Sequence, residues 1–559
     1  MKKIVFLILF SLCSISLFAA SGNSTQIIKS GHWIYDDLET LCMESKSEYF
    51  FETQPMTIGE MKFYFQRIPY EKLSQNGKIL YEKVKSFLNK NDDFFPNLEL
   101  RFFTNIQLNP EFYYKSNPNV DWSFNYFIRE FPITLPIIIG FSDYVTIEPD
   151  LMLGKNQPAA NEPYNFTNIP YAGNHFEFNF PRFAYGAVGY AFDKWGVNFV
   201  AAREGLQIFN TQLGSIIYNR TFETDFYCSL NLYTEYLKYS LHVAEIDNTK
   251  FLYLHQLNMI PFRWLKINVL EGSLLNAPFE IRYLNPFMIM HQFGSWTQYG
   301  SALTDNELKY YEEGRFCAYF ALMFEVTPFK NFKIYGLYSQ NEILDMGGSR
   351  DDHALSYPDS LGGQLGIQYN INLKDKSMIK TYLEGIYTSP YLYVKQSPEW
   401  SLYRSRINML YDKETVTWIG SPFGPDSFAV TLKAEYDSQE KWKAGLGYTF
   451  SIHGENSSSS LFSKYDESLG IYTYYPTVQY NLANENNDES GMQAAKDKGR
   501  YMWLTGINTY KHQIKLEGSY SILENLIVYG QSIYTIQIYN SEIFHCIELG
   551  CGVEYKLFK

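Results

Sequence analysis

Long apolar runs are scarce in this sequence. Beyond residue 20 the longest one, residues 131–141, contains Pro132, Pro136 and Gly140. A helix that crosses a bilayer needs about 20 consecutive apolar residues, so this stretch is too short and too broken to cross one. We therefore expect no membrane-spanning helix in the mature chain.

The N-terminus carries the kind of apolar segment that is typical of export. Two lysines precede an apolar run over residues 4–18, and two small alanines end it. This order of charge, apolar core and small residues predicts a secretory signal peptide over residues 1–20, cleaved after Ala20. The alternative is a lipoprotein with Cys13 as its first mature residue, which would need a shorter apolar segment and a cut after the bulky Leu12.

Positive charge and cysteine are also limited. The chain has 47 Lys and Arg against 60 Asp and Glu, and its net charge of −13 falls by two to −15 once the N-terminal lysines are removed. A chain this acidic repels a phosphate backbone, so we expect no nucleic-acid partner. Five of the six cysteines would survive cleavage. An odd number without metal-ligand spacing predicts neither a disulfide framework nor a metal site.

Catalytic motifs are missing as well. The sequence contains no HExxH, GxSxG, GxxxxGK[ST] or GxGxxG pattern, and its nine histidines are scattered. Adjacent carboxylates such as Asp351 and Asp352 lie in expected loops, where adjacency says little about the spacing that glycosidic chemistry requires. We expect neither an enzyme nor a bound cofactor.

Aromatic residues, in contrast, are abundant. They make up 18% of the chain, as 48 Tyr, 43 Phe and 9 Trp, although the mean hydropathy is slightly hydrophilic at −0.26. A soluble core does not need so many tyrosines. A membrane barrel does, because tyrosine presents an apolar ring to lipid and a hydroxyl to the headgroups, which forms girdles at both interfaces.

After the signal, residues 21–97 show a helical pattern. Asp36 with Glu39, and Thr57 with Glu60, fit a helix N-cap followed three residues later by a carboxylate. A third helix is predicted by apolar residues at three- and four-residue spacing: Leu80, Val84, Phe87 and Leu88. We interpret this segment as a small helical periplasmic domain.

Over residues 98–559 the period changes to two. Residues 318–327 alternate and turn at 328–331 into a second alternating segment, and residues 514–538 show the same hairpin pattern. Residues 547–557 alternate at the C-terminal end and resemble the terminal strand that outer-membrane assembly machinery recognises. The pattern predicts a mainly β chain in which a transmembrane antiparallel β-barrel follows the helical domain.

Connections of unequal length support the barrel. Short turns alternate with long polar stretches at 344–360, 454–464 and 482–499, as periplasmic turns alternate with outer loops. At roughly 25 residues per strand and connection we expect about 18 strands, with 16 as the alternative. The soluble alternatives are a sandwich or a propeller, but the sequence lacks the 40- to 50-residue repeat of a propeller.

Several segments resemble, in order, the capsule assembly Wzi family of outer-membrane barrels. The match covers most of the mature chain. Its segments are His32-Trp33-Ile34-Tyr35, Pro55-Met56-Thr57 with Glu60, Arg203-Glu204-Gly205 with Gly214, residues 255–261 followed by Leu270-Glu271, Leu284-Asn285-Pro286, Thr388-Ser389-Pro390-Tyr391 and residues 420–426. The resemblance implies a lectin-like barrel in the outer membrane of a diderm bacterium, whose outer loops hold a capsule or exopolysaccharide at the cell surface.

Five residues are candidates for glycan binding or for structural roles. Arg203 and Glu204 are adjacent on an expected strand and so face opposite sides; we interpret one as part of a network inside the barrel and the other as a rim residue. We expect Glu271 to face the lumen, as we do for Glu325, because a lipid-facing charge is costly. Tyr391 lies near Tyr387 and Tyr393, in a stacking surface or an aromatic girdle. Asp426 ends a turn rich in Gly and Pro, where it could cap the backbone or contact sugar.

Three functions follow from these patterns. The first is binding or anchoring of surface polysaccharide. The second is a porin or solute channel, favoured by the barrel size and the acidic composition. The third is a surface scaffold or adhesin, for which deletion of residues 482–499 would abolish attachment without disturbing assembly.

Overall fold

The structure, a computed structural model, describes most of the chain. The described residues are 23–90, 100–123, 131–141, 143–154, 164–169, 177–179, 184–220, 225–287, 290, 303–311, 316–342, 354–374, 376–408 and 413–557. The expected signal peptide and most of the 344–360 stretch lie outside them. Within them, no helix has the length and apolar character needed to cross a membrane.

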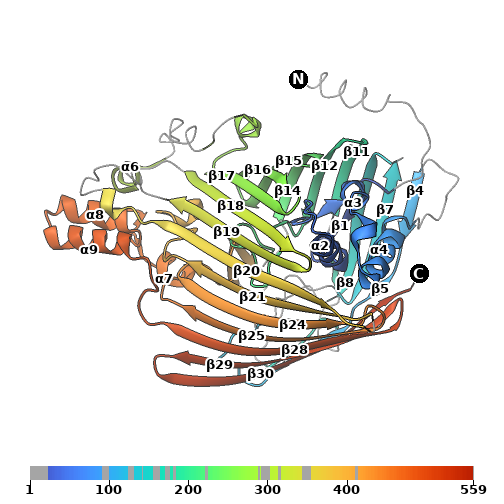
Figure 1. The fold of residues 1–559 in the computed structure, drawn as a ribbon. Helices are drawn as coiled ribbons and strands as arrows, with labels where there is room; N and C mark the ends of the chain where they lie inside the picture. Colours follow the sequence, from blue (N-terminus) through green and yellow to red (C-terminus); the bar gives the residue numbers. More distant parts are fainter. Residues whose placement is uncertain are drawn as a thin grey trace.

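One antiparallel sheet closes on itself into a barrel (Figure 1). Closure occurs because β8 pairs with both β7 and β11, while the C-terminal strand β30 pairs with β5 and β6. The short strands β4, β5 and β6 together fill the one strand position between β30 and β7 and count as one strand. The short strands β9 and β10 are not counted as strands of the barrel wall. The barrel therefore has 18 strands, as predicted. Its strands are β4 (Leu100–Thr104), β5 (Gln107–Leu108), β6 (Glu111–Lys115), β7 (Ile133–Phe141), β8 (Val145–Gly154), β9 (Asn165–Thr167), β10 (Glu177–Asn179), β11 (Ala184–Ala191), β12 (Trp195–Glu204), β14 (Asp225–Thr234), β15 (Leu237–Asp247), β16 (Lys250–Phe262), β17 (Leu265–Asn276), β18 (Phe316–Phe329), β19 (Phe332–Glu342), β20 (Ser360–Asn372), β21 (Met378–Thr388), β24 (Ser427–Asp437), β25 (Trp442–His453), β28 (Thr509–Leu523), β29 (Leu526–Tyr539) and β30 (Glu542–Lys556).

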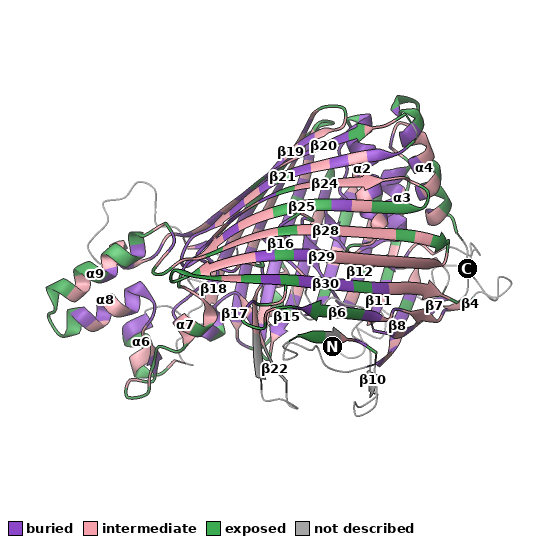
Figure 2. Cartoon of the chain, turned by 90° about the horizontal axis from the view of Figure 1, so that it is seen from below, coloured by how far each residue is buried: buried purple, intermediate pink, exposed green. Residues whose placement is uncertain are grey.

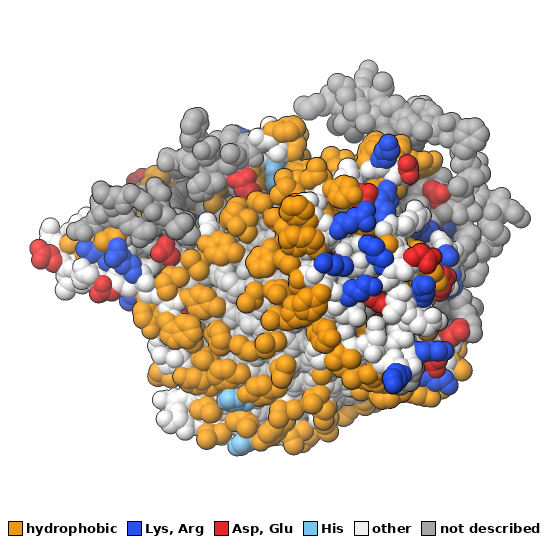
Figure 3. Space-filling view, viewed as in Figure 1, with side chains coloured by type: hydrophobic (Ala, Val, Ile, Leu, Met, Phe, Trp, Pro, Cys, Tyr) orange, Lys and Arg blue, Asp and Glu red, His pale blue; other side chains and the backbone are white. Residues whose placement is uncertain are grey.

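Buried residues alternate with more exposed ones along the strands (Figure 2). The outer face is apolar and the inner face is mostly polar. On β18, Leu322 and Phe324 are exposed on the outside, while the neighbouring Met323 and Glu325 are buried inside. The outer residues form the apolar surface of Figure 3, and charged side chains gather at its right-hand end. This arrangement is what a lipid-facing barrel wall requires, because a charge in the bilayer interior is costly.

The two ends of the barrel differ. At one end, here the short-turn end, hairpins such as β18–β19 and β28–β29 turn within a few residues at the predicted positions. Stacked aromatic side chains surround this end. Phe262 stacks on Trp264 with ring centroids 5.4 Å apart, and Tyr436 stacks on Trp442 with centroids 4.4 Å apart. They form one of the two aromatic girdles that the composition predicts.

The opposite end, here the long-loop end, carries folded connections. They hold β13 (Gln207–Ile208), η3 (Ile281–Leu284), α6 (Asp305–Tyr311), η5 (Ala354–Ser356), η6 (Pro398–Trp400), β22 (Tyr403–Asn408), β23 (Lys413–Trp418), α7 (Ser458–Phe462), β26 (Tyr465–Asp466), β27 (Ile471–Tyr472), α8 (Pro476–Glu485) and α9 (Glu489–Arg500). Residues 482–499 are therefore largely helical, which their polar composition did not predict. Figure 1 shows α8 and α9 projecting beyond the barrel.

The N-terminal helices pack inside the short-turn end (Figure 1). They are α2 (Trp33–Ser45), α3 (Ile58–Phe65) and α4 (Gln75–Leu88), with the short strands β1 (Ile27–Ile28), β2 (Thr53–Gln54) and β3 (Met56–Thr57) and the turn η1 (Tyr70–Lys72). Thr57 caps α3 by accepting a hydrogen bond from Glu60 N at 3.2 Å, as predicted. The cap expected at Asp36 is wrong: α2 begins one turn earlier, with His32 as its N-cap and Asp36 in its first turn.

Candidate functional site

The helical domain is held in the barrel by acidic side chains that meet lysines on alternate strands. Lys238 on β15 lies 2.6 Å from Glu60, and Lys266 on β17 lies 2.8 Å from Glu52. The remaining contacts of this series are Lys333 on β19 with Glu39, Lys380 on β21 with Asp36 at 2.5 Å, and Lys266 with Glu325 of the wall itself. These lysines stand at inward-facing positions of their strands, so the barrel offers a row of cations to acidic side chains of the helical domain.

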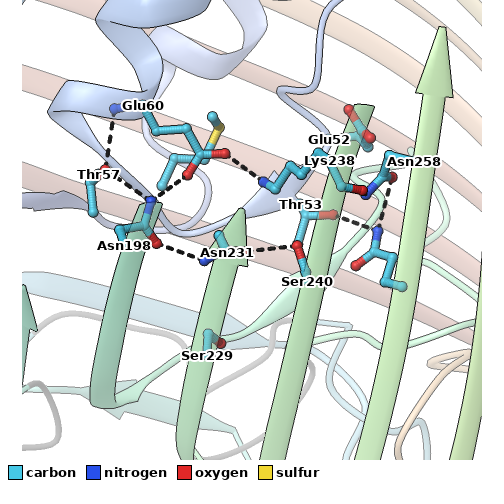
Figure 4. Close-up of polar contacts among 12 residues, drawn as sticks. Glu52, Thr53, Thr57, Glu60, Asn198, Ser229, Asn231, Lys238, Ser240 and Asn258 are labelled. Atoms are coloured by element: carbon cyan, nitrogen blue, oxygen red, sulfur yellow. Dashed lines mark hydrogen bonds and ion pairs between the residues drawn. The ribbon is translucent and has the colours of Figure 1, made fainter. Parts of the chain in front are cut away.

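Neutral side chains continue the contact between domain and wall (Figure 4). Asn198 donates a hydrogen bond to Glu60 at 2.9 Å, and Asn231 donates to Asn198 at 2.8 Å. Ser240 donates to Asn231 at 2.7 Å. Buried polar groups cost free energy unless they are hydrogen-bonded. This series of hydrogen bonds therefore favours one position of the helical domain inside the barrel.

The connection from β12 to β14 closes the lumen from the other side. It runs into the barrel, where β13 pairs with β2 of the helical domain. Glu384 on β21 accepts hydrogen bonds from Gln212 N at 2.9 Å and Leu213 N at 2.7 Å, and Ile216 and Ile217 are fully buried. The lumen is therefore filled by a domain from the short-turn end and by a folded connection from the long-loop end.

A cavity of about 500 Å³ remains beside α2. Its lining includes His32, Trp33, Glu435, Lys443 and Glu517. Asp437 pairs with Lys443 at 2.7 Å, and Glu517 pairs with Lys433 at 3.2 Å. Acidic side chains outnumber basic ones in the lining, which holds Asp36, Glu435, Asp437 and Glu517 with Lys380 and Lys443.

At the long-loop end, three connections pack into one unit, here the loop layer: residues 303–311, the described parts of 389–426, and residues 454–508. Tyr311, Trp400 and Tyr475 are almost completely buried in its aromatic core. Asn481 of α8 donates to Tyr310 O at 3.0 Å, which ties two of the connections together. The loop layer is a folded surface, because it has a core of its own.

Part of the loop layer presents exposed aromatic and basic side chains together. Tyr465 is 48% exposed, and its ring centroid lies 4.8 Å from that of Tyr472. Gln479 receives a hydrogen bond from Lys498 at 2.9 Å. Burial and the nearby positive charge of Lys464 lower the pKa of Lys498. We call Lys464, Tyr465, Tyr472 and Lys498 the Tyr465 face.

The first three candidate residues lie apart from the Tyr465 face. Glu204 points inward and accepts hydrogen bonds from Ser30 N at 3.1 Å and Ser30 Oγ at 3.3 Å, while Arg203 points outward over the ring of Phe226, 5.3 Å from its centroid. The expectation that Glu271 faces the lumen is wrong. It shares the outward phase of Ile267 and Val269 and pairs in register with His255.

An outward carboxylate is tolerated at Glu271 because the chain after β17 covers this part of the wall. His255 contacts Tyr283 O at 2.9 Å, and Glu280 N donates to Tyr253 Oη at 2.8 Å. Tyr283 is fully buried there. The segment that contains η3 therefore lies against the outside of the barrel and separates these polar groups from lipid.

Tyr391 and Asp426 lie within the loop layer and are both buried. Tyr391 packs edge-on against Tyr475, with centroids 5.9 Å apart. Asp426 accepts hydrogen bonds from Asn456 N at 2.9 Å and Thr505 N at 3.0 Å. Burial raises the pKa of Asp426 above its ordinary value. Both residues are buried and help to hold the layer together, which favours a structural role over contact with a sugar.

The lysine row and the Tyr465 face were not predicted. The lysines stand at inward positions of their strands, which alternation could have located, but their acidic partners lie far away in the sequence. The Tyr465 face depends on α8 and α9, which the polar composition concealed. Among the described residues, no three His, Cys, Asp or Glu side chains come together as a metal site.

Comparisons with known proteins bear on the fold. A scan against known protein families finds no match, and a search of curated proteins finds no relative. Among solved structures the chain is similar to Wzi, an outer-membrane protein involved in group 1 capsule assembly in Escherichia coli and a carbohydrate-binding β-barrel. The identity is 11% and the TM-score 0.54, over 94% of this chain and 98% of that one.

Two further solved structures are less similar. OprD of Pseudomonas aeruginosa matches with 10% identity and a TM-score of 0.38, over 82% of this chain and 95% of that one. A loop-deletion variant of OmpT, an outer-membrane protein of Vibrio cholerae, matches with 9% identity and a TM-score of 0.32, over 82% and 100%. These two scores are too low to carry an argument, whereas the likeness to Wzi supports the 18-stranded barrel fold and, at its low identity, nothing finer.

Proposed function

We propose that this chain is an outer-membrane barrel that holds surface polysaccharide through its loop layer. In such barrels the short turns face the periplasm and the long loops face the outside. The helical domain would then lie on the periplasmic side and the Tyr465 face on the cell surface. The barrel fold shared with a carbohydrate-binding protein supports this assignment, as does the order of sequence motifs.

The observation that carries the proposal is the combination of a filled lumen with a folded outer surface. A barrel that passes solute needs an open path, whereas here both ends contribute chain to the interior. The loop layer instead offers aromatic rings beside lysines on an otherwise acidic protein. Rings present apolar faces to sugar rings, and lysines attract the acidic groups of a charged polysaccharide.

Polysaccharide retention on cells tests the proposal. Cells that lack the gene are complemented with the wild type, with the triple variant Lys464→Gln/Tyr465→Ala/Lys498→Gln, or with the control Glu467→Gln, which changes an exposed residue of the same hairpin. We expect binding of labelled capsule-type polysaccharide to fall by about tenfold in the triple variant and to stay unchanged in the control. Equal binding by the wild type and the gene-deleted strain would refute the role.

A solute channel is the second candidate function. The cavity of about 500 Å³ beside α2 favours it, because it shows that the helical domain leaves part of the lumen unfilled. Planar-bilayer recording separates the two functions, since a channel conducts steadily and a plugged barrel does not.

A further inference from the structure

Two histidines stand on the lipid-facing wall near the long-loop end. His512 on β28 and His545 on β30 lie in register on either side of Ile536 on β29. Their strands begin or end about three residues away, which places them roughly 7–8 Å below the strand ends for strands tilted by about 40°. Taking the strand ends as the outer edge of the headgroup layer, we infer that the histidines lie where the headgroups meet the acyl chains.

Each histidine is oriented by a tyrosine from the neighbouring strand. Tyr448 Oη lies 2.8 Å from His512 Nδ1, and Tyr534 Oη lies 2.9 Å from His545 Nδ1. The rings of each pair are stacked at interplanar angles of 30° and 16°, with centroids 6.3 and 6.1 Å apart. Because Nδ1 is engaged by the tyrosine, the remaining ring nitrogen, Nε2, is the one left for an external partner.

The same geometry therefore occurs twice at one height on the wall. Two strand spacings separate the histidines, which is about 10 Å. The row just below them consists of Tyr448, Ile514, Tyr534 and Ile547. A repeated, oriented pair is a built arrangement, in contrast to an isolated histidine in an aromatic girdle.

These imidazoles are the basic side chains at the outward positions of this part of the wall. On β25, β28, β29 and β30, which the structure describes in full, the outward positions hold no Lys, Arg, Asp or Glu. Figure 3 shows histidine side chains standing among apolar ones on the lower part of the face. An ionisable side chain on a lipid-facing wall is costly unless it has a partner there, so its presence indicates a function.

We propose that the two His–Tyr pairs form a binding site for the phosphate headgroup of an outer-leaflet lipid. Nε2 of each imidazole donates a hydrogen bond to a phosphate oxygen. The apolar residues below, Ile514, Leu516, Ile547 and Leu549, are 46–55% exposed and receive the acyl chains. The site is independent of polysaccharide binding, because it lies on the barrel wall and not on the loop layer.

Lipid titration of the purified barrel tests the site. Native mass spectrometry in a neutral detergent compares phosphatidylglycerol with diacylglycerol, which has the same chains and no phosphate. We expect the wild type to bind phosphatidylglycerol about tenfold more tightly, and the variant His512→Phe/His545→Phe to bind both lipids equally. Tyr520→Phe, a lipid-facing change on the same strand outside the proposed site, is the control and keeps the preference.

Two further arms keep the test decisive. The variant Tyr448→Phe/Tyr534→Phe retains the rings and removes the orienting hydroxyls, so we expect the preference for phosphatidylglycerol to fall by about threefold. This variant carries the test if the histidine variant does not show the heat-modifiable gel migration of a folded barrel. The proposal is overturned if the histidine variant keeps the full preference. It is also overturned if inorganic phosphate alone saturates the wild type at the concentrations that lipid requires, because the site would then select free anions.

Discussion

Lys238 and Glu60 form an ion pair that joins the barrel wall to the helical domain. Their side chains lie 2.6 Å apart, with exposed fractions of 3% and 1%. Removal of one member of a buried pair leaves an uncompensated charge, which costs more than the pair itself contributes. The position of the helical domain in the barrel therefore depends on the presence of both Lys238 and Glu60.

The first prediction concerns this pair. Glu60→Ala should destabilise the docked helical domain by about 3–5 kcal/mol, because it leaves Lys238 buried without its carboxylate. The double variant Glu60→Leu/Lys238→Met removes both charges and should recover most of that loss. Hydrogen exchange of α3 in detergent measures the change.

The matched control is a half-buried pair between the helical domain and the barrel wall. Arg67 and Glu235 lie 3.8 Å apart with side chains 21% and 31% exposed, so Glu235→Gln should cost less than about 1 kcal/mol. Equal effects of Glu60→Ala and Glu235→Gln would show that the buried pair does not hold the domain.

The second prediction concerns Asp426, which joins β24 to the connection over residues 454–508. Asp426→Ala removes the acceptor of the backbone N–H groups of Asn456 and Thr505, so it should destabilise this part of the loop layer by about 2–4 kcal/mol. Limited proteolysis of intact cells should cut residues 454–508 at least tenfold faster. Asp497→Ala, an exposed change on α9, serves as control.

If Asp426 instead contacted the sugar directly, the opposite pattern of retention and proteolysis would be expected. In that case Asp426→Ala would lower polysaccharide retention while the proteolysis rate stayed that of the wild type. The burial of Asp426 argues for the structural outcome.

The third prediction concerns pH. Burial, with the charges of Lys556 and Lys83, lowers the pKa of His32 from 6.5 to about 3. The unfolded chain takes up this proton below pH 6.5 and the folded chain only near pH 3, so stability is lost as the pH falls between these values. From pH 7 to pH 5 the loss is about 2 kcal/mol.

His32→Asn isolates this contribution, because asparagine is a good N-cap and does not titrate. Chemical denaturation at pH 7 and pH 5 should show a difference between wild type and variant that shrinks by about 2 kcal/mol at the lower pH. A difference that is independent of pH would mean that His32 is not buried in its neutral form.

The sequence was sufficient for the barrel and for the alternation of its strands. The prediction that Glu325 on β18 faces the lumen is confirmed, because one buried face fixes the register of that strand. The predicted capping of α3 by Thr57 is also confirmed, because it needs only a local hydrogen bond. Local patterns suffice wherever neighbouring residues decide the structure.

The errors arose where distant segments decide. Alternation alone places Glu271 outward with Ile267. The cost of a lipid-facing charge nevertheless led to the prediction that Glu271 faces the lumen. The segment around Tyr283 covers this part of the wall and removes that cost, and no local pattern in the sequence shows where this segment lies. Likewise Asp36 was read as a cap, whereas it is the partner of Lys380, more than 300 residues away. Such pairs become visible only once the barrel is closed.

Planar-bilayer recording of the purified barrel tests most directly whether its lumen is closed. With the helical domain seated and the connection after β12 folded inside, the wild type should insert without steady conductance, whereas Glu60→Ala should show intermittent openings as the domain loosens. A steady, ohmic conductance of the wild type would contradict the plugged lumen and favour the solute channel.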